Sequence, residues 1–231
     1  MNILCTICAR KGSKGLKNKN FLKIYNKKLI FYSIDQAKEI KDIDDIIIST
    51  DLEIPKKELK KRDLKIFFKR NKNLSSDRAG KVPVIRDALL KAEYFYKKKY
   101  DIIIDLDVSS PLRKLHDIKK AIKMFLDSDS NNLITACKSR KNPYFNMVEI
   151  VNDKLCLVKK MKKKILRRQD ARQVYDVNAS IYIWKRNYLL KSNTIISNKT
   201  SLYEMPYNRS VDIDSKDDLK IVKLFLKNDK K

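Results

Sequence analysis

Histidine, cysteine, glycine and long apolar runs are scarce in this chain of 231 residues. The one histidine, His116, stands near a predicted helix start and is not expected to be catalytic. Four cysteines do not make a disulfide framework in a chain of this size. No apolar run approaches the roughly 18 residues of a membrane-spanning helix, and no charged segment followed by an apolar one opens the chain. These absences predict a cytoplasmic protein without a membrane partner.

Acidic residues are also few relative to basic ones. The 28 Asp and Glu residues stand against 54 Lys and Arg residues, which gives a formal net charge of +26. Such a charge raises nucleic acid as a partner. The lysines are spread through every segment, however, and no aromatic-interleaved or named nucleic-acid motif accompanies them. Biased genomic composition explains much of the charge, so nucleic-acid binding is the disfavoured alternative.

Short apolar runs alternate with helical patterns over the first 137 residues. The runs predict buried strands because each is short and almost wholly apolar, and they lie at 3–8, 46–49, 64–68, 102–106 and 133–137. Apolar residues at helical spacing predict helices between them, at 29–40, 54–61, 82–96 and 117–126. Such repeated β-α units predict an α/β fold with a doubly wound, mostly parallel sheet. We expect a single domain spanning residues 1–231.

The pattern changes after about residue 138. Residues 147–151 and 154–158 predict a hairpin around an Asn-Asp turn, and 174–184 predicts a further strand. We interpret the hairpin as part of an inserted arm at about 138–175. Because a projecting apolar arm usually finds a partner, and a symmetric dimer is the simplest one, the arm predicts a homodimer. A strand end at 211–214 and a helix at about 216–226 complete the expected elements.

The loop after the first strand combines glycines with cations. Ligands bind beyond the carboxyl ends of the strands in such sheets. Gly12 and Gly15 allow tight turns whose N–H groups converge on an anion, while Arg10, Lys14 and Lys19 neutralise its charge. The loop therefore predicts a polyphosphate site, although it has neither the P-loop nor the dinucleotide-binding spacing. In a chain this rich in lysine, a solvated turn is the alternative.

Two Asp-x-Asp pairs are the other candidates for chemistry. Asp105 and Asp107 form one pair, and Asp212 and Asp214 form the other. Residues two apart in extended chain share a face, so each pair could hold a divalent metal through oxygen ligands. A strand-end turn or helix cap is the alternative for either pair. The phosphate loop at the same sheet edge favours metal binding, because Mg²⁺ normally accompanies substrate phosphates.

Six motifs, in this order, resemble the acylneuraminate cytidylyltransferases, which make CMP-activated acylneuraminates. The motifs are Ala9-Arg10-Lys11-Gly12-Ser13-Lys14-Gly15, Lys19-Asn20, Ser49-Thr50-Asp51, Ser110-Pro111-Leu112-Arg113, Asn178-Ala179-Ser180-Ile181-Tyr182 and Asp212-Ile213-Asp214. The match covers essentially the whole chain. Within the family, residues 4–10, 105–107 and 142–146 are most similar to the bacterial CMP-legionaminic acid synthases.

The resemblance implies a Rossmann-like nucleotide-diphospho-sugar transferase fold and an Mg²⁺-dependent transfer of CMP. The donor is CTP, the acceptor is the anomeric hydroxyl of a nine-carbon 2-keto sugar acid, and pyrophosphate leaves. Legionaminic acid or its N,N'-diacetyl form is the favoured acceptor, and N-acetylneuraminic acid is the second. A different class remains as an alternative: a glycosyltransferase that uses Asp105-Leu106-Asp107 to bind a metal and a finished nucleotide sugar.

The resemblance also implies roles for individual residues. Those implied to bind the nucleotide are Arg10, Gly12, Ser13, Lys14, Asn20 and Arg70, with Arg10 and Lys19 acting as catalytic residues on the triphosphate. Asp212 and Asp214 are implied to bind Mg²⁺. Those implied to bind the sugar are Asp107, Ser109, Ser110, Arg113, Arg168 and Asn178, with Arg168 reaching it from the dimer arm.

Some positions depart from the family pattern. Asp107 stands where sialic-acid enzymes commonly have Gln, which exchanges a donor-acceptor for an acceptor only. We therefore expect a sugar specificity different from sialic acid. Gly80-Lys81 stands where those enzymes often have Ser-Ser, and Ala179-Ser180 replaces Gly-Ala. Lys11, where the family has a small or neutral residue, is expected to be solvated.

Overall fold

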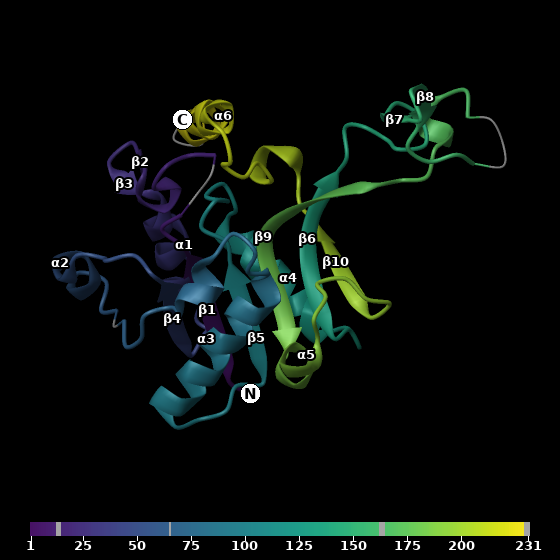
Figure 1. Cartoon of the computed structure of the whole chain (residues 1–231). Coiled ribbons are helices and arrows are strands. Elements are labelled where there is room, and N and C mark those ends of the chain that lie inside the picture. The colour runs from purple at the N-terminus through teal and green to yellow at the C-terminus, as the bar shows by residue number, and fades with distance from the viewer. Residues whose placement is uncertain (13–14, 65, 162–164, 229–231) are drawn as a thin grey trace.

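Six strands form the central sheet of the protein, whose computed structural model describes residues 1–12, 15–64, 66–161 and 165–228 (Figure 1). Their order across the sheet is β10-β6-β9-β5-β1-β4. They are β1 (Ile3–Ala9), β4 (Asp45–Thr50), β5 (Ile102–Leu106), β6 (Asn132–Lys138), β9 (Tyr175–Lys185) and β10 (Thr200–Glu204). Only β9 runs antiparallel to its neighbours, and the other pairs are parallel. The predicted mostly parallel sheet is confirmed.

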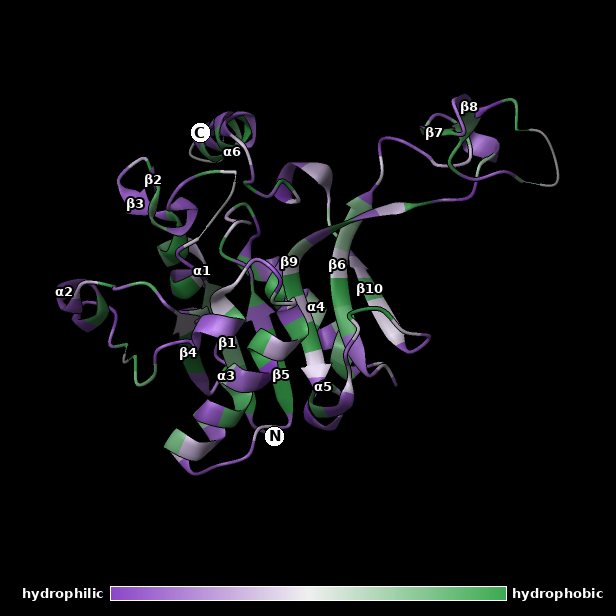
Figure 2. Cartoon of the chain, viewed as in Figure 1, coloured by the Kyte–Doolittle hydropathy of each residue, from purple (hydrophilic) through white to green (hydrophobic). Residues whose placement is uncertain are grey.

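Helices cover both faces of this sheet. Apolar residues of α1 (Leu29–Lys38), α4 (Leu115–Leu126) and α6 (Lys216–Asn228) share one core with the strands. Those of α3 (Lys81–Tyr96) and α5 (Arg186–Lys191) share a second core. Figure 2 shows the hydrophobic residues concentrated in the strands between them. Such a sheet, apolar on both faces, requires the near-continuous apolar runs by which its strands were predicted.

The remaining elements of the described chain are short. They are η1 (Lys19–Phe21), β2 (Lys23–Ile24), β3 (Lys27–Lys28), α2 (Lys56–Lys60), η2 (Lys72–Ser75), β7 (Val148–Val151), β8 (Lys154–Leu157), η3 (Arg168–Asp170) and η4 (Tyr207–Arg209). Cys5 belongs to the first core, and Cys8 packs against the second. The two cysteines therefore lie on opposite faces of β1. No helix in the described ranges has both the length and the apolar character to cross a membrane.

The prediction of a strand at 64–68 is wrong for residues 64 and 66–68, which have no strand structure. The aromatic residues there pack on helix α3 and do not extend the sheet. The ring of Phe67 stacks on that of Phe95 with centroids 3.9 Å apart, and it meets Tyr96 edge-on. The segment still reaches the sheet at its end, where Arg70 N–H donates to the carbonyl of Thr50 at 2.9 Å. Residues 64 and 66–68 are only partly buried, so the apolar run overstated the burial and gave the wrong partner.

The C-terminal part differs from the prediction in two further respects. Residues 211–214 do not form a strand. One backbone hydrogen bond, from Ile213 N–H to the Ser109 carbonyl at 2.9 Å, joins them to the loop after β5. The edge strand β10 was not predicted from its sequence, Thr-Ser-Leu-Tyr-Glu. It pairs with β6 and its residues are only partly buried, so it lacks the apolar run that marks the central strands.

The predicted hairpin is confirmed as strands β7 and β8, which project from the sheet (Figure 1). Asn152 and Asp153 both have positive φ, 49° and 58°, as the two central residues of a primed hairpin turn require. The hairpin exposes large apolar side chains, including Val148 at 56%, Ile150 at 74% and Leu155 at 71%. The arm therefore carries apolar surface that this chain leaves open to solvent.

Gly15 lies where the loop after β1 passes the segment before α6. A Cβ atom on Gly15 would lie 2.1 Å from the backbone oxygen of Asp214, which is far inside van der Waals contact. A Cβ on Gly12, in contrast, would meet nothing within 4 Å among the described residues. The absence of a side chain at Gly15 thus allows two segments that are far apart in sequence to touch.

We therefore predict that Gly15→Ala destabilises the protein and Gly12→Ala does not. Overpacking costs about 1–3 kcal/mol, which corresponds to roughly 2–10 °C in the melting temperature of a chain of this size. Differential scanning calorimetry of the two variants and the wild type measures the difference. Equal melting temperatures for both variants would show that the contact between Gly15 and Asp214 yields without cost.

Candidate functional site

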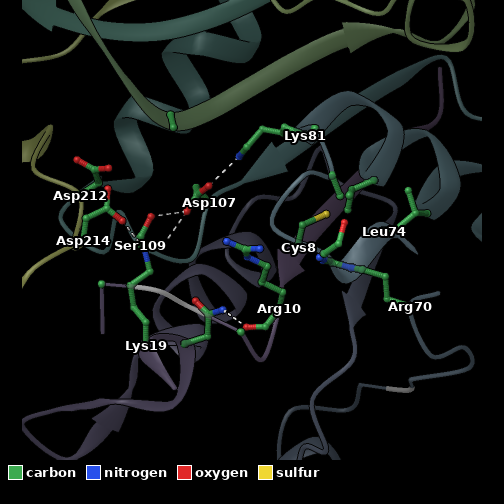
Figure 3. Close-up of a pocket in the computed structure, with 18 residues that line it drawn as sticks. Cys8, Arg10, Lys19, Arg70, Leu74, Lys81, Asp107, Ser109, Asp212 and Asp214 are labelled. Atoms are coloured by element: carbon green, nitrogen blue, oxygen red, sulfur yellow. Dashed lines mark hydrogen bonds and ion pairs between the residues drawn. The ribbon is translucent and has the colours of Figure 1, made fainter. Parts of the chain in front are cut away.

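A cavity of about 480 Å³ lies beyond the carboxyl ends of β1 and β5 (Figure 3). It is lined by the loop after β1, the segment from Arg70 to Val84, the loop after β5, one residue of β9 and two residues of the segment before α6. The structure brings nine of the predicted site residues together here: Arg10, Gly12, Lys19, Asn20, Arg70, Asp107, Ser109, Asp212 and Asp214. Ser13 and Lys14 lie outside the described residues.

Side chains hold the loop after β1 and its flanks in place. The Asn20 amide donates to the Arg10 carbonyl at 2.8 Å, and the Arg10 guanidinium pairs with Asp77 at 2.5 Å. Lys11, expected to be solvated, is exposed, and its backbone N–H donates to Asp51 at 2.7 Å. Arg70 is 6% exposed and donates to the hydroxyl and the carbonyl of Ser49. The basic groups thus line one side of the cavity in fixed orientations.

Asp212 and Asp214 line the same cavity. Burial and the neighbouring charge of Asp214 raise the pKa of Asp212, while Lys19 Nζ pairs with Asp214 Oδ1 at 2.7 Å. A divalent cation would relieve the repulsion between the two carboxylates, and oxygen ligands are those that Mg²⁺ prefers. In the described ranges no third His, Cys, Asp or Glu completes a metal cluster with them. The pair therefore fits an ion that takes its other ligands from water and phosphate.

The segment that carries these carboxylates has little regular structure and is fixed by side chains. Arg209 makes two hydrogen bonds to the fully buried Asp117 of α4, at 2.8 and 3.0 Å. The Asn178 amide donates to the Ser210 hydroxyl at 2.9 Å. These contacts on both sides of the chain hold Asp212 at the cavity.

Three predicted sugar-binding residues lie behind the cavity wall, among the residues it does not include. Arg113 is 1% exposed and donates to the carbonyls of Asp107 and Ser180, each at 2.6 Å. Burial lowers its pKa to about 10, which leaves it charged at neutral pH. Ser110 donates to the Asn178 carbonyl at 3.3 Å. The structure thus places Arg113, Ser110 and Asn178 as supports of the wall, and their contact with a sugar stays a prediction.

Arg168 lies on the arm, apart from this cavity. Its guanidinium donates to the Ser139 carbonyl at 3.1 Å, and it lines a separate cavity of about 330 Å³ with residues such as Asn142 and Arg172. The structure therefore does not bring Arg168 to the cavity of its own chain. Its predicted contact with a sugar bound to a second copy stays a prediction.

Lys81, a departure from the family pattern, also lines the cavity, although the sequence did not predict a place for it in the site. Its ammonium bridges Asp107 at 2.7 Å and Asp105 at 3.0 Å. Burial would lower the pKa of Lys81, but these carboxylates raise it above its ordinary value. Burial also opposes ionisation of Asp107, yet the charge of Lys81 and hydrogen bonds from Ser109 hold its pKa below the usual range. A lysine directly after Gly80, at the start of a helix pattern, was the available signal.

The bridge that Lys81 makes to Asp105 and Asp107 also bears on whether these two carboxylates could bind a metal ion. Asp105 is fully buried, and its two oxygens accept from Thr6 and Lys81. Since the ammonium of Lys81 already pairs with both carboxylates of Asp105-Leu106-Asp107, this arrangement argues against a metal ion there. Nearby, Ala179 lines the cavity with a positive φ of 53°, a conformation that favours the glycine of the family pattern.

Comparison with known proteins gives the family to which the sequence is similar. The family model described as "Cytidylyltransferase" matches residues 4–226. "CMP-N,N'-diacetyllegionaminic acid synthase" of Campylobacter jejuni is 48% identical over 97% of this chain and 94% of its own length. "Post-translational flagellin modification protein B" of Campylobacter coli is 47% identical over 97% of this chain and 95% of its own length.

A solved structure supports the fold. "CMP:2-keto-3-deoxy-manno-octonic acid synthetase complexed with CTP" superposes with a TM-score of 0.72, covering 99% of this chain and 100% of that one at 17% identity. At that identity the likeness concerns the fold alone, which is the predicted Rossmann-like fold of nucleotidyltransferases. Because the family model matches nearly the whole length of the chain, the chain belongs to the cytidylyltransferase family.

Proposed function

We propose that this protein transfers CMP from CTP to the anomeric hydroxyl of a nonulosonic acid and releases pyrophosphate. The acceptor is legionaminic acid or N,N'-diacetyllegionaminic acid, as the name of the 48% identical relative supports. The observation that carries the proposal is one cavity that places Arg10 and Lys19 beside the carboxylates of Asp212 and Asp214. Because CTP is a cytoplasmic nucleotide, we place the reaction in the cytoplasm.

The reaction requires the protein to position the two substrates and to compensate the negative charge of the phosphates. The anomeric oxygen attacks the α-phosphorus, the bond between that phosphorus and the bridging oxygen to the β-phosphate breaks, and the hydroxyl proton passes to solvent. Arg10 and Lys19 would neutralise the triphosphate, and each is at present paired with a carboxylate that a phosphate can replace. Such positioning and electrostatic stabilisation can supply most of the acceleration of phosphoryl transfer.

Asp212 and Asp214 would hold the Mg²⁺ ion in this scheme. When bound, the ion supplies positive charge to the phosphates. The raised pKa of Asp212 and the proximity of Lys19 to Asp214 support this assignment. Arg113, Ser110 and Asn178 would act on the sugar through the wall that they support.

The function predicts that purified protein releases pyrophosphate from CTP when Mg²⁺ and N,N'-diacetyllegionaminic acid are both present. A coupled pyrophosphate assay with a panel of nonulosonic acids measures this, and N-acetylneuraminic acid should be the poorer acceptor. Omission of the sugar acid is the control. A glycosyltransferase would instead consume a finished CMP-sugar and release no pyrophosphate from CTP. Absence of pyrophosphate with every acid tested would refute the proposal.

The metal assignment predicts that Asp214→Ala lowers kcat/KM by at least roughly 100-fold, because charge on the phosphates is then poorly compensated. Chelation by EDTA should also abolish turnover, and added Mg²⁺ should restore it. Asp217→Ala is the matched control, since Asp217 is exposed on α6 and pairs with Lys220 at 2.8 Å. Circular dichroism should show that both variants keep the fold. Undiminished turnover of Asp214→Ala would remove that residue from the metal site.

We also propose that the arm formed by β7 and β8 pairs two copies of the chain. Its exposed side chains Val148, Ile150 and Leu155 are apolar and lie together on a two-stranded hairpin. Hairpins of two strands are marginally stable alone, so burial against a partner would stabilise this one. In a homodimer, that partner would be a second copy of the chain.

The proposed dimer predicts that Ile150→Lys combined with Leu155→Lys yields a monomer, because two buried charges would oppose association. Size-exclusion chromatography with light scattering measures the mass. The control is Tyr94→Lys, which alters a side chain that is 89% exposed on α3 of the body. A wild-type protein of monomeric mass, or an arm variant that stays dimeric, would contradict the assignment.

A further inference from the structure

The bridge from Lys81 to the two aspartates stands at the wall of the cavity. Lys81 is the first residue of α3, and its ammonium lies 4.6 Å from the centre of the Tyr182 ring. The side chains of Lys81 and Asp107 are 21% and 20% exposed, whereas that of Asp105 is fully buried. Figure 3 shows the ammonium pointing toward Asp107. Asp105 is therefore inaccessible, and Lys81 and Asp107 are the two members of the bridge that a ligand can touch.

Both groups retain hydrogen-bonding capacity. An ammonium has three donors, and Lys81 directs two of them to Asp105 and Asp107. Oδ1 of Asp107 accepts from the N–H and the hydroxyl of Ser109, at 2.8 and 2.6 Å. Oδ2 accepts from Lys81 alone among the residues described here. A carboxylate has about four acceptor sites, so one donor of Lys81 and one acceptor site of Asp107 remain side by side.

We propose that Lys81 and Asp107 together bind one hydroxyl group of the acceptor sugar and thereby select it. The hydroxyl hydrogen is donated to Asp107 Oδ2, and the hydroxyl oxygen accepts from Lys81 Nζ. A hydroxyl is the smallest group that can do both at once. This assignment rests on the proposed function and adds Lys81 to the residues that determine which acid is used.

Two sequence departures then have one explanation. Asp107 replaces a glutamine of sialic-acid enzymes and by itself loses the donor that an amide has. Lys81, in place of a serine, returns that donor from the start of helix α3. It also offsets the charge of Asp107, which would otherwise repel an acidic acceptor. The pair is therefore the counterpart of one amide side chain, built from two segments.

The experiment measures KM for the acceptor and for CTP separately, in the pyrophosphate assay with N,N'-diacetyllegionaminic acid. Lys81→Met and Asp107→Asn should each raise KM for the acceptor about 10- to 100-fold, the usual effect of losing a hydrogen bond to a charged group. KM for CTP should change by less than about threefold. Adding Asp107→Gln to Lys81→Met should recover about tenfold of the loss, because one amide again supplies donor and acceptor.

Lys91→Met is the matched control on the same helix, since Lys91 pairs with Asp87 at 2.8 Å and lies away from the cavity residues. Both its KM values should stay within about twofold of wild type. An acceptor KM that does not change, a KM for CTP that rises in step, or no recovery with the glutamine would overturn the inference. If Lys81→Met does not fold, Asp107→Asn decides by the same comparison of KM values. An inactive wild type would instead refute the proposed function.

Discussion

The matching of aspartates by lysines at one edge of the sheet is the constraint on which the site depends. Lys81 is ion-paired with Asp105 and Asp107, and Lys19 pairs with Asp214. A buried carboxylate such as Asp105 would be costly without a cation, so its pairing with Lys81 also fixes where the start of α3 can lie. The helix start at Lys81, the loop after β5 and the loop after β1 are thereby drawn to one cavity. The +26 net charge of the chain does not explain this arrangement of segments, which depends on a few lysines in defined orientations.

Much of the site is built from residues that a ligand would not touch. Arg113 binds the backbone of the loop that carries Asp107, and Asp117 holds Arg209 in the segment that carries Asp212. A resemblance by motif does not distinguish these supporting residues from the residues that line the cavity. In the structure, their burial and the hydrogen bonds that they already make identify them as supports and not as ligand contacts.

The sequence predicted the strands that are almost wholly apolar, such as β1 and β5, because a parallel sheet covered on both faces needs such runs. The prediction of strands failed where apolar residues pack against another element and not within the sheet. Phe67 packs on Phe95 and so gave the apolar signal of a strand without forming one. The edge strand β10, only partly buried, gave too weak a signal. Among the described residues that line the cavity, Arg10, Lys19 and the aspartates at 107, 212 and 214 were predicted by their types and order, but Lys81 was not.

Residue types and their order along the chain determined the fold class, the family and the identity of half of the residues that line the cavity. Those properties are local, since they depend on apolar spacing and on motifs within a few residues. The tertiary structure alone decided which charges meet, because Lys19 and Asp214 are 195 residues apart. It also distinguished the two Asp-x-Asp pairs, which look alike in sequence. One is ion-paired with Lys81, and the other leaves a carboxylate with a raised pKa facing the cavity, because different helices and loops cover them.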